Sequence, residues 1–233
     1  KFGSVPLIEA SGAYLAHAVQ AGPTRFKKGT LLKSDELETL KGAGIASVIV
    51  ARLEPGDIGE DEAATRLASI ARHPSLRLAK AATGRVNIHS EFEGLFVVNK
   101  SAIDAINRID PSITVATLGE FATVTRGQMV ATVKIIPFAV PETAIAKALA
   151  VAGGFEGTLF SVAQWQPRRV GLVATMLPSL KPEIMDKTAR ILGARLARSG
   201  SHIMAELRVQ HDEHAVARAI EKLADQGAEL IIV

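Results

Sequence analysis

The last third of the chain has the clearest hydrophobic pattern. Continuous apolar runs alternate with stretches in which apolar residues recur every three or four positions, and these patterns are typical of buried strands and amphipathic helices. They predict strands at 170–175, 202–209 and 228–233, with helices at 182–199 and 213–226. Right-handed crossovers turn such a β-α-β-α-β order into a parallel sheet with helices on its faces. We therefore expect residues 167–233 to form the first part of a three-layer α/β domain.

The preceding residues, 1–166, mix helical and strand patterns. Serine, glycine and proline positions predict helices that begin and end within this region. The expected helices span 8–19, 34–44, 60–72, 101–109 and 141–152, and the expected strands span 45–53, 113–117, 122–124, 128–136 and 158–162. The period near two after residue 112 predicts strands that curl into a small sheet or barrel, with a tight turn at Arg126-Gly127. The predicted fold class is therefore α/β, with a mixed α/β region before a boundary at Pro167.

The chain ends inside the last predicted strand, at Leu230-Ile231-Ile232-Val233. A parallel strand is usually buried on both faces, so an end at this point leaves apolar surface that another element should cover. We therefore expect this sequence to be a truncated part of its domain.

Composition narrows the classes of function. A chain of 233 residues that is 48% hydrophobic can bury a sizeable core, and a net charge of +3 without a basic stripe among aromatic residues predicts no nucleic-acid binding. The absence of cysteine excludes disulfides and thiolate chemistry and fits a reducing compartment. No apolar run approaches the roughly 18 residues of a membrane span, and no signal-peptide pattern opens the chain. We therefore expect a cytoplasmic protein with no membrane partner.

Two loops of the last region are candidate binding sites, because ligands of open α/β sheets bind beyond the carboxyl ends of the strands. The first loop, 176–181, offers Thr175, Ser179 and Lys181 to an anion near the amino end of the helix that Pro182 begins. The alternative is a connector that the prolines shape and in which Ser179 and Lys181 are only solvated.

The second loop contains His211-Asp212-Glu213-His214, a spacing of imidazoles and carboxylates that can hold a metal ion. Asp212 is equally suited to cap the following helix, with Glu213 complementing the helix dipole. A third interpretation is that Asp212 holds a hydrated Mg²⁺ beside a substrate phosphate.

Two further polar segments lie in the first region. Arg85 and Asn87, within the run from Thr83 to His89, can bind an anion or the edge of a heterocycle, although a solvated turn is an equal alternative. The basic cluster Arg25-Phe26-Lys27-Lys28 is interpreted first as a solvated loop and second as an anion contact. The chain has no cysteine, no G-x-S-x-G elbow and no Walker A loop, so residue chemistry alone indicates no reaction.

The last region resembles a known fold. The segments 170–175, 205–212 and 228–233 are similar to the opening of the molybdopterin-binding fold that molybdopterin adenylyltransferases and molybdopterin molybdenumtransferases share. In those families the third strand leads into a glycine-rich loop with an acidic residue, and this sequence ends before that loop. The families usually carry two acidic residues after the second strand, where this chain has His211-Asp212, so only Asp212 matches.

The first region also resembles the leading part of the molybdenumtransferase family, in segments 5–19 and 28–48, although its D-G-Y/F-A type motif is absent. Segment 131–140 adds a likeness to a bacterial subgroup in which such a region precedes a nucleotidyltransferase-like domain. The resemblance implies binding of molybdopterin, or of its nucleotide form, during molybdenum-cofactor biosynthesis. It places Lys181 and Asp212 near the phosphate and a Mg²⁺ ion.

Several alternatives remain open at this point. The protein can be a transferase, a non-catalytic module that carries the cofactor to or from a partner, or an unrelated nucleotide-binding α/β protein. A homodimer, a nucleotidyltransferase-like domain and a molybdoenzyme are the partners that the resemblance implies. Because the glycine-rich loop is missing, we expect this chain itself to bind molybdopterin weakly or not at all.

Overall fold

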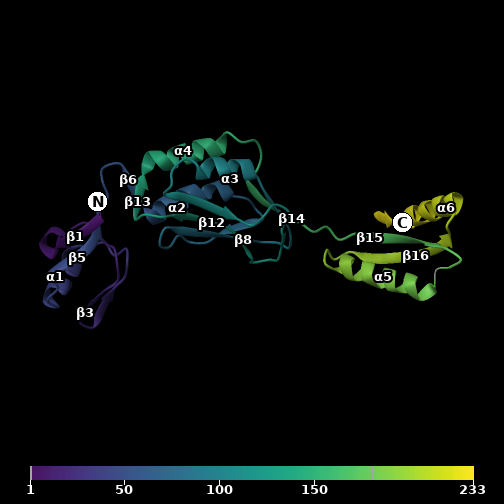
Figure 1. Cartoon of the computed structure of the whole chain (residues 1–233), viewed down its shortest axis with the longest axis horizontal. Coiled ribbons are helices and arrows are strands. Elements are labelled where there is room, and N and C mark those ends of the chain that lie inside the picture. The colour runs from purple at the N-terminus through teal and green to yellow at the C-terminus, as the bar shows by residue number, and fades with distance from the viewer. Residues whose placement is uncertain (1, 180) are drawn as a thin grey trace. The chain divides into compact units, whose positions relative to one another are not determined.

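The computed structural model describes residues 2–179 and 181–233 and has an α/β fold (Figure 1). Helices alternate with strands that form several short sheets, and within the described residues none of these sheets closes into a barrel. The predicted α/β class is confirmed, and the predicted "small sheet or barrel" is a set of open sheets. The chain divides into two compact units, of which unit 1 ends at Ala163 and unit 2 begins at Gln164.

Unit 1 begins with a small sheet and its own core. The strands here are β1 (Phe2–Pro6), β2 (Tyr14–Leu15), β3 (Val19–Ala21), β4 (Thr24–Phe26) and β5 (Ser47–Ala51), joined by the 3-10 turn η1 (Leu7–Glu9) and helix α1 (Ser34–Gly42). Strand β5 lies between β1 and β2, and β3 and β4 form a hairpin. Buried leucines, among them Leu15, Leu32 and Leu40, fill the core beneath them.

The helix predicted at 8–19 is wrong. Leu7–Glu9 forms one 3-10 turn, after which Gly12 takes a φ of +71° that interrupts any helix. The Gly12 amide donates to the Leu32 carbonyl, and the Leu32 amide donates to the Ala13 carbonyl. Partners distant in the sequence therefore satisfy this backbone. The apolar residues within 8–19 are buried in the small core, where β2 pairs with β5, and do not form a helical face.

The larger part of unit 1 has three helices against antiparallel sheets. Its strands are β6 (Asp57–Gly59), β7 (Leu76–Leu78), β8 (Arg85–Ser90), β9 (Gly94–Val98), β10 (Ile113–Thr117), β11 (Thr123–Val124), β12 (Met129–Ile135), β13 (Ala139–Pro141) and β14 (Phe160–Gln164), and its helices are α2 (Glu60–Ala68), η2 (Ser69–Ala71), α3 (Lys100–Asn107) and α4 (Glu142–Gly153). The main sheet has the order β10-β12-β8-β7. Helix α2 packs on β8 and β12, and the fully buried rings of Phe96 and Phe160 lie 6.4 Å apart in the core.

Strand pairing in this part joins segments that are distant in the sequence. The turn at Arg126-Gly127 is present, with Gly127 at φ +83°, but β11 pairs with β9 and β12 pairs with β8 and β10. The Gly127 amide donates to the Ser90 carbonyl, so the turn is held against the end of β8. Pairing across distant segments therefore determines this sheet.

Unit 2 contains the predicted β-α-β-α-β sequence. Its elements are β15 (Arg169–Met176), α5 (Pro182–Ala197), β16 (His202–Gln210), α6 (Glu213–Asp225) and β17 (Leu230–Ile232). The three strands are parallel with β15 in the centre, and Figure 1 shows α5 and α6 on opposite faces of the sheet. A Cβ atom at Gly171 would lie 2.8 Å from Leu223 Cδ1, so the glycine permits the close approach of α6.

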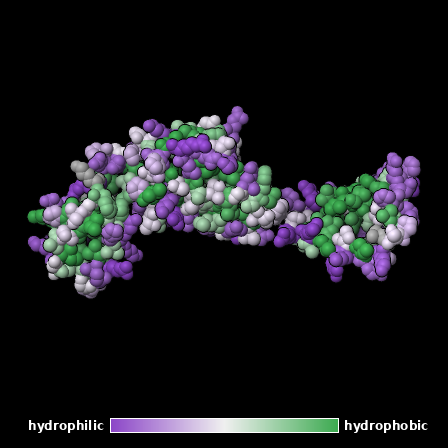
Figure 2. All heavy atoms as spheres, viewed as in Figure 1, coloured by the Kyte–Doolittle hydropathy of each residue, from purple (hydrophilic) through white to green (hydrophobic). Residues whose placement is uncertain are grey.

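The exposed surface of unit 2 is partly apolar, and Figure 2 shows hydrophobic residues gathered on its visible face. In the described part of the chain, no helix has the length and apolar character needed to cross a bilayer.

Candidate functional site

The carboxyl ends of β15 and β16 meet at one edge of the unit 2 sheet. The two strands pair in parallel up to Met176 and Gln210, so the loops that follow them start side by side. The Thr175 hydroxyl and His211 Nδ1 form a hydrogen bond of 3.2 Å across this edge. This contact connects the end of β15 to the loop that follows β16, at the edge that the sequence nominates as a binding site.

Helix α5 begins at this edge with an open first turn. Lys181 occupies the N-cap position, its side chain makes no capping hydrogen bond, and Pro182 stands at the first helical position, where its missing N–H is not needed. Ser179 and Lys181 are both exposed, and among the described residues neither side chain has a hydrogen bond. Pro182 has no N–H, and the Ile184 amide donates to the Lys181 carbonyl at 3.0 Å, so this helix start attracts an anion mainly through its dipole and the Lys181 ammonium group.

Helix α6 begins at the same edge, and its first turn is capped. Asp212 Oδ1 accepts a hydrogen bond of 2.9 Å from the Ala215 amide. The capping role considered for Asp212 is therefore present in the structure. Within residues 2–179 and 181–233, no three His, Asp or Glu side chains gather closely enough to hold a metal ion, so a cation at Asp212 would need ligands from a bound phosphate.

The other two predicted site residues, Arg85 and Asn87, lie on β8 in unit 1. Asn87 Oδ1 accepts a hydrogen bond of 2.9 Å from the Thr132 hydroxyl on the neighbouring strand β12, and the Arg85 side chain is exposed. The six candidate residues therefore form two groups, with Thr175, Ser179, Lys181 and Asp212 together in unit 2.

Unit 1 contains a second candidate site, which sequence reasoning did not assemble. It is a polar cavity of about 400 Å³, lined by Tyr14, Lys28, Gly29, Leu53, Asp57, Ile58, Gly59, Glu60, Asp61, Glu62, Thr83 and Phe138. These residues come from segments that are far apart in the sequence. The basic cluster and the Thr83 segment are each visible as motifs, but no local pattern indicates that they meet.

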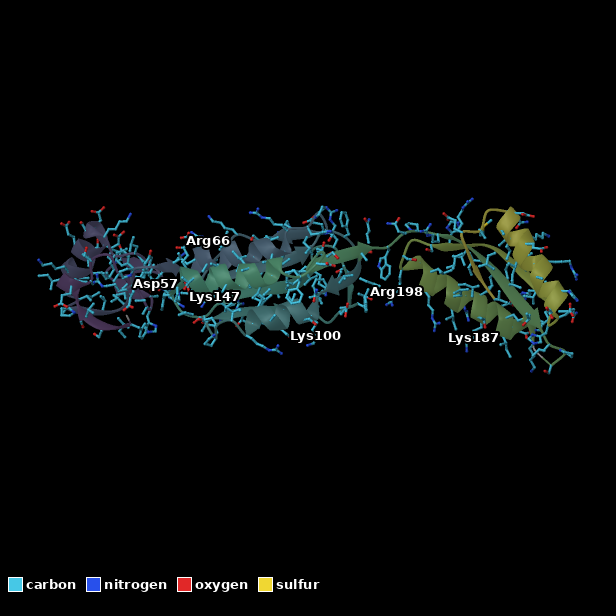
Figure 3. The ribbon with its side chains drawn as sticks, turned by 90° about the horizontal axis from the view of Figure 1, so that it is seen from above. Asp57, Arg66, Lys100, Lys147, Lys187 and Arg198 are labelled. Carbon is cyan, nitrogen blue, oxygen red and sulfur yellow. The ribbon has the colours of Figure 1, made fainter. Side chains whose placement is uncertain are left out.

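Three of the four carboxylates in this cavity have structural partners. Asp57 Oδ2 accepts from the Glu54 amide at 2.9 Å, and Asp61 Oδ1 accepts from the Gly84 amide at 2.7 Å. Glu62 forms an ion pair with Arg66, which also contacts Glu142 and so connects α2 to α4; Figure 3 labels Asp57 and Arg66. Glu60 is the one carboxylate of this cavity for which the described residues give no hydrogen bond or ion pair to its side chain.

Glu60 and Lys28 are the chemically distinctive pair of the cavity. Burial raises the pKa of the Glu60 carboxyl, while Lys28 and Lys134 act in the opposite direction and Asp61 adds to the rise. Lys28 Nζ lies 4.5 Å from the centroid of the Phe138 ring, a cation–π contact. A partly buried carboxyl group and an ammonium group at one cavity suit a small ligand that has both donor and acceptor groups.

The backbone around this cavity is constrained. Thr83 has a φ of +51°, which is unusual for a β-branched residue, and Gly84 has a φ of +69°. A Cβ atom at Gly84 would lie 2.6 Å from the Ile135 carbonyl oxygen and 3.0 Å from Glu60 Oε2. Glycine is therefore required at position 84.

Comparisons with known proteins give limited information. Residues 4–52, which enclose β1 to β5, match the family described as "Domain of unknown function (DUF8806)". A search of the curated proteins finds no match. A solved structure titled "The Crystal Structure of molybdopterin biosynthesis moea protein from Pyrococcus horikosii" is 12% identical, with a TM-score of 0.22, and the likeness covers 99% of this chain and 58% of that one. A likeness at this TM-score carries no argument about fold or function.

Proposed function

We propose that unit 2 binds the phosphate-bearing end of molybdopterin, or of its nucleotide form, at the carboxyl edge of its sheet, as a step of molybdenum-cofactor biosynthesis. The observation that carries the proposal is the hydrogen bond between Thr175 and His211, which brings the two edge loops together. The resemblance of segments 170–175, 205–212 and 228–233 to the molybdopterin-binding fold supports the choice of ligand.

The electrostatics of the edge suit a phosphate. The first turn of α5 supplies the positive end of a helix dipole, and Lys181 adds a cation at the same point. Ser179 adds a hydroxyl donor, whereas Glu183 in the first turn of α5 opposes an anion. A phosphate therefore fits best on the Lys181 side of the edge.

Asp212 has a separate part in the proposal. Its Oδ1 caps α6, and a carboxylate can still offer its second oxygen to a cation. Mg²⁺ in proteins is commonly held by one or two carboxylates together with substrate phosphates and water. Asp212 and the ligand phosphate together match that donor set. Arg85 and Asn87 belong to unit 1, and the proposal does not use them.

The test is a calorimetric titration of molybdopterin into the natural full-length protein, compared with two variants. Because a charged hydrogen bond contributes about 1.5–3 kcal/mol, Lys181→Ala should weaken binding by roughly ten- to a hundredfold. Lys222→Ala, in the last turn of α6, is the matched control and should leave the affinity unchanged. Absence of binding, or equal losses in both variants, would reject the proposal.

Binding and turnover assays with the same full-length protein distinguish the competing functions. Binding of ATP or CTP without binding of molybdopterin would favour an unrelated nucleotide-binding protein. Binding of the pterin with no turnover of nucleotide or molybdate would favour a non-catalytic carrier module, whereas turnover that Asp212→Asn abolishes would favour a transferase.

A further inference from the structure

The polar cavity of unit 1 has charged groups of both signs in its lining. The positive group is the ammonium of Lys28, and the negative groups are the carboxylates of Asp57, Glu60, Asp61 and Glu62. Backbone amides or Arg66 occupy three of these carboxylates. Lys28 and Glu60 are therefore the two charged groups of the lining whose side chains have no hydrogen bond or ion pair within the described part of the chain.

Lys28 and Glu60 interact electrostatically without forming a contact. Burial raises the pKa of the Glu60 carboxyl, and the positive charge of Lys28 acts in the opposite direction, so the two groups lie near each other. They nevertheless form no ion pair with each other. Two opposite charges that line one cavity and stay apart leave space for a ligand that contacts both of them.

Phe138 positions both charged groups. Its carbonyl accepts a hydrogen bond of 2.9 Å from the Glu60 amide, and Lys28 Nζ lies 4.5 Å from the centroid of its ring. Glu60 Oε2 lies 3.0 Å from the point that a Cβ atom at Gly84 would occupy, so the carboxyl group packs against a glycine that cannot be replaced without a clash. Because the two groups are held in place before a ligand arrives, binding orders few side chains and loses little entropy.

The lining disfavours ligands that carry one sign of charge only. A simple anion beside Lys28 would also meet the four carboxylates, and a simple organic cation beside Glu60 would also meet the Lys28 ammonium group. Among the described residues, no three His, Asp or Glu side chains gather closely enough to hold a metal ion. Leu53, Ile58 and the Phe138 ring add apolar surface, which suits the carbon skeleton of an organic ligand.

We infer that this cavity binds a small amino carboxylate, a molecule with an ammonium group and a carboxylate group on an apolar carbon skeleton. The ammonium group of the ligand donates to the Glu60 carboxylate, and the ligand carboxylate accepts from Lys28. The cavity volume of about 400 Å³ lies within the range of small-molecule sites and has room for a free amino acid. The inference concerns unit 1 and does not rest on the proposed pterin site of unit 2.

The test compares three probes that share one phenyl ring and differ in charge. Phenylalanine carries both charged groups, phenethylamine lacks the carboxylate, and phenylpropionate lacks the ammonium group. In NMR titrations with the natural full-length protein, we expect phenylalanine to bind at least about tenfold more tightly than either of the other probes, because each of them lacks one charged hydrogen bond.

Two charge variants locate the binding site. Lys28→Gln should weaken the binding of phenylalanine and phenylpropionate by about tenfold or more, and it should strengthen the binding of phenethylamine, because a like charge is removed. Glu60→Gln should weaken phenylalanine and phenethylamine and strengthen phenylpropionate for the same reason. A misfolded chain would lose all three probes, so a gain for one probe excludes unfolding as the cause.

Matched controls exist for both variants. Lys27→Gln and Glu93→Gln remove the same charges at exposed positions of unit 1 that lie outside the cavity lining. Both controls should leave the affinities for the three probes unchanged.

Three results would overturn the inference. The first is absence of phenylalanine binding. The second is binding of phenethylamine or phenylpropionate as tight as that of phenylalanine, because the cavity would then select a cation or an anion instead of an amino carboxylate. The third is phenylalanine binding that neither Lys28→Gln nor Glu60→Gln weakens, because the amino acid would then occupy another part of the protein.

Discussion

In unit 1, α2 lies on the central strands β8 and β12, and Phe96 and Phe160 are fully buried beneath the helices. In unit 2, α6 covers one face of a three-stranded sheet, and α5 leaves an open groove on the other face. Both units contain similar apolar strands. The position of each helix relative to the sheet centre therefore determines how much of the strand surface is buried.

The difference has a consequence for stability. The free energy of unfolding of a small domain depends on the apolar area that it removes from water, and unit 2 comprises only residues 164–233 with a small buried cluster. We expect unit 1 to be the more stable of the two and unit 2 to unfold first.

The largest effect should follow from Phe160→Ala in unit 1. Removal of a fully buried phenyl ring should lower the free energy of unfolding of this unit by about 3–5 kcal/mol. Hydrogen exchange read by mass spectrometry should show loss of protection in 1–163 and none in 164–233. Phe92→Ala, at a ring that is 36% exposed, is the control and should change stability little. Equal loss of protection in both units would contradict the expectation that the two units unfold independently.

A smaller effect is expected from Gly171→Val in unit 2. The new Cβ atom would lie 2.8 Å from Leu223 Cδ1, so α6 must move outward, at a cost of about 1–3 kcal/mol. Protection of β15 and α6 should decrease while unit 1 is unchanged. Gly193→Ala on α5 is the control, because nothing lies within 4 Å of its new Cβ and helix propensity should raise stability by about 0.5–1 kcal/mol.

Asp212→Ala should have a modest effect that is confined to unit 2. Loss of the hydrogen bond to the Ala215 amide removes the cap of α6 and should destabilise the unit by about 1 kcal/mol. Chemical denaturation followed by circular dichroism measures the change. Asp212→Asn keeps a capping oxygen and should restore most of the stability, so an equal loss in both variants would point to charge and not to capping.

The smallest expected effect is a pH dependence in unit 1. Burial raises the pKa of Glu60, so the folded state holds this proton more tightly than the unfolded chain does. The stability that this proton contributes is present at low pH and is lost as the pH rises through the raised pKa. Thermal unfolding across this range should show that decline in the natural protein and a flatter profile in Glu60→Gln. If the Glu60→Gln variant keeps the same pH profile as the natural protein, Glu60 is not the source of the pH dependence.

Most elements of unit 2 follow from local sequence patterns. Strong apolar runs at 170–175 and 202–209 and the helical period between them depend on local spacing, and the structure places β15, α5 and β16 there to within two residues at each end. The capping role of Asp212 is local in the same way, because its side chain reaches an amide only three residues ahead.

The features that local patterns did not predict depend on contacts between distant segments. The segment 8–19 lost its helical pattern to pairing with Leu32 and to the turn at Gly12, and β11 paired with β9 instead of its neighbour in the chain. The meeting of Lys28 and Glu60 in one cavity, and the placement of α5 over an outer strand, likewise depend on contacts between distant segments. Periodicity records which residues are buried, but it does not record which partner buries them.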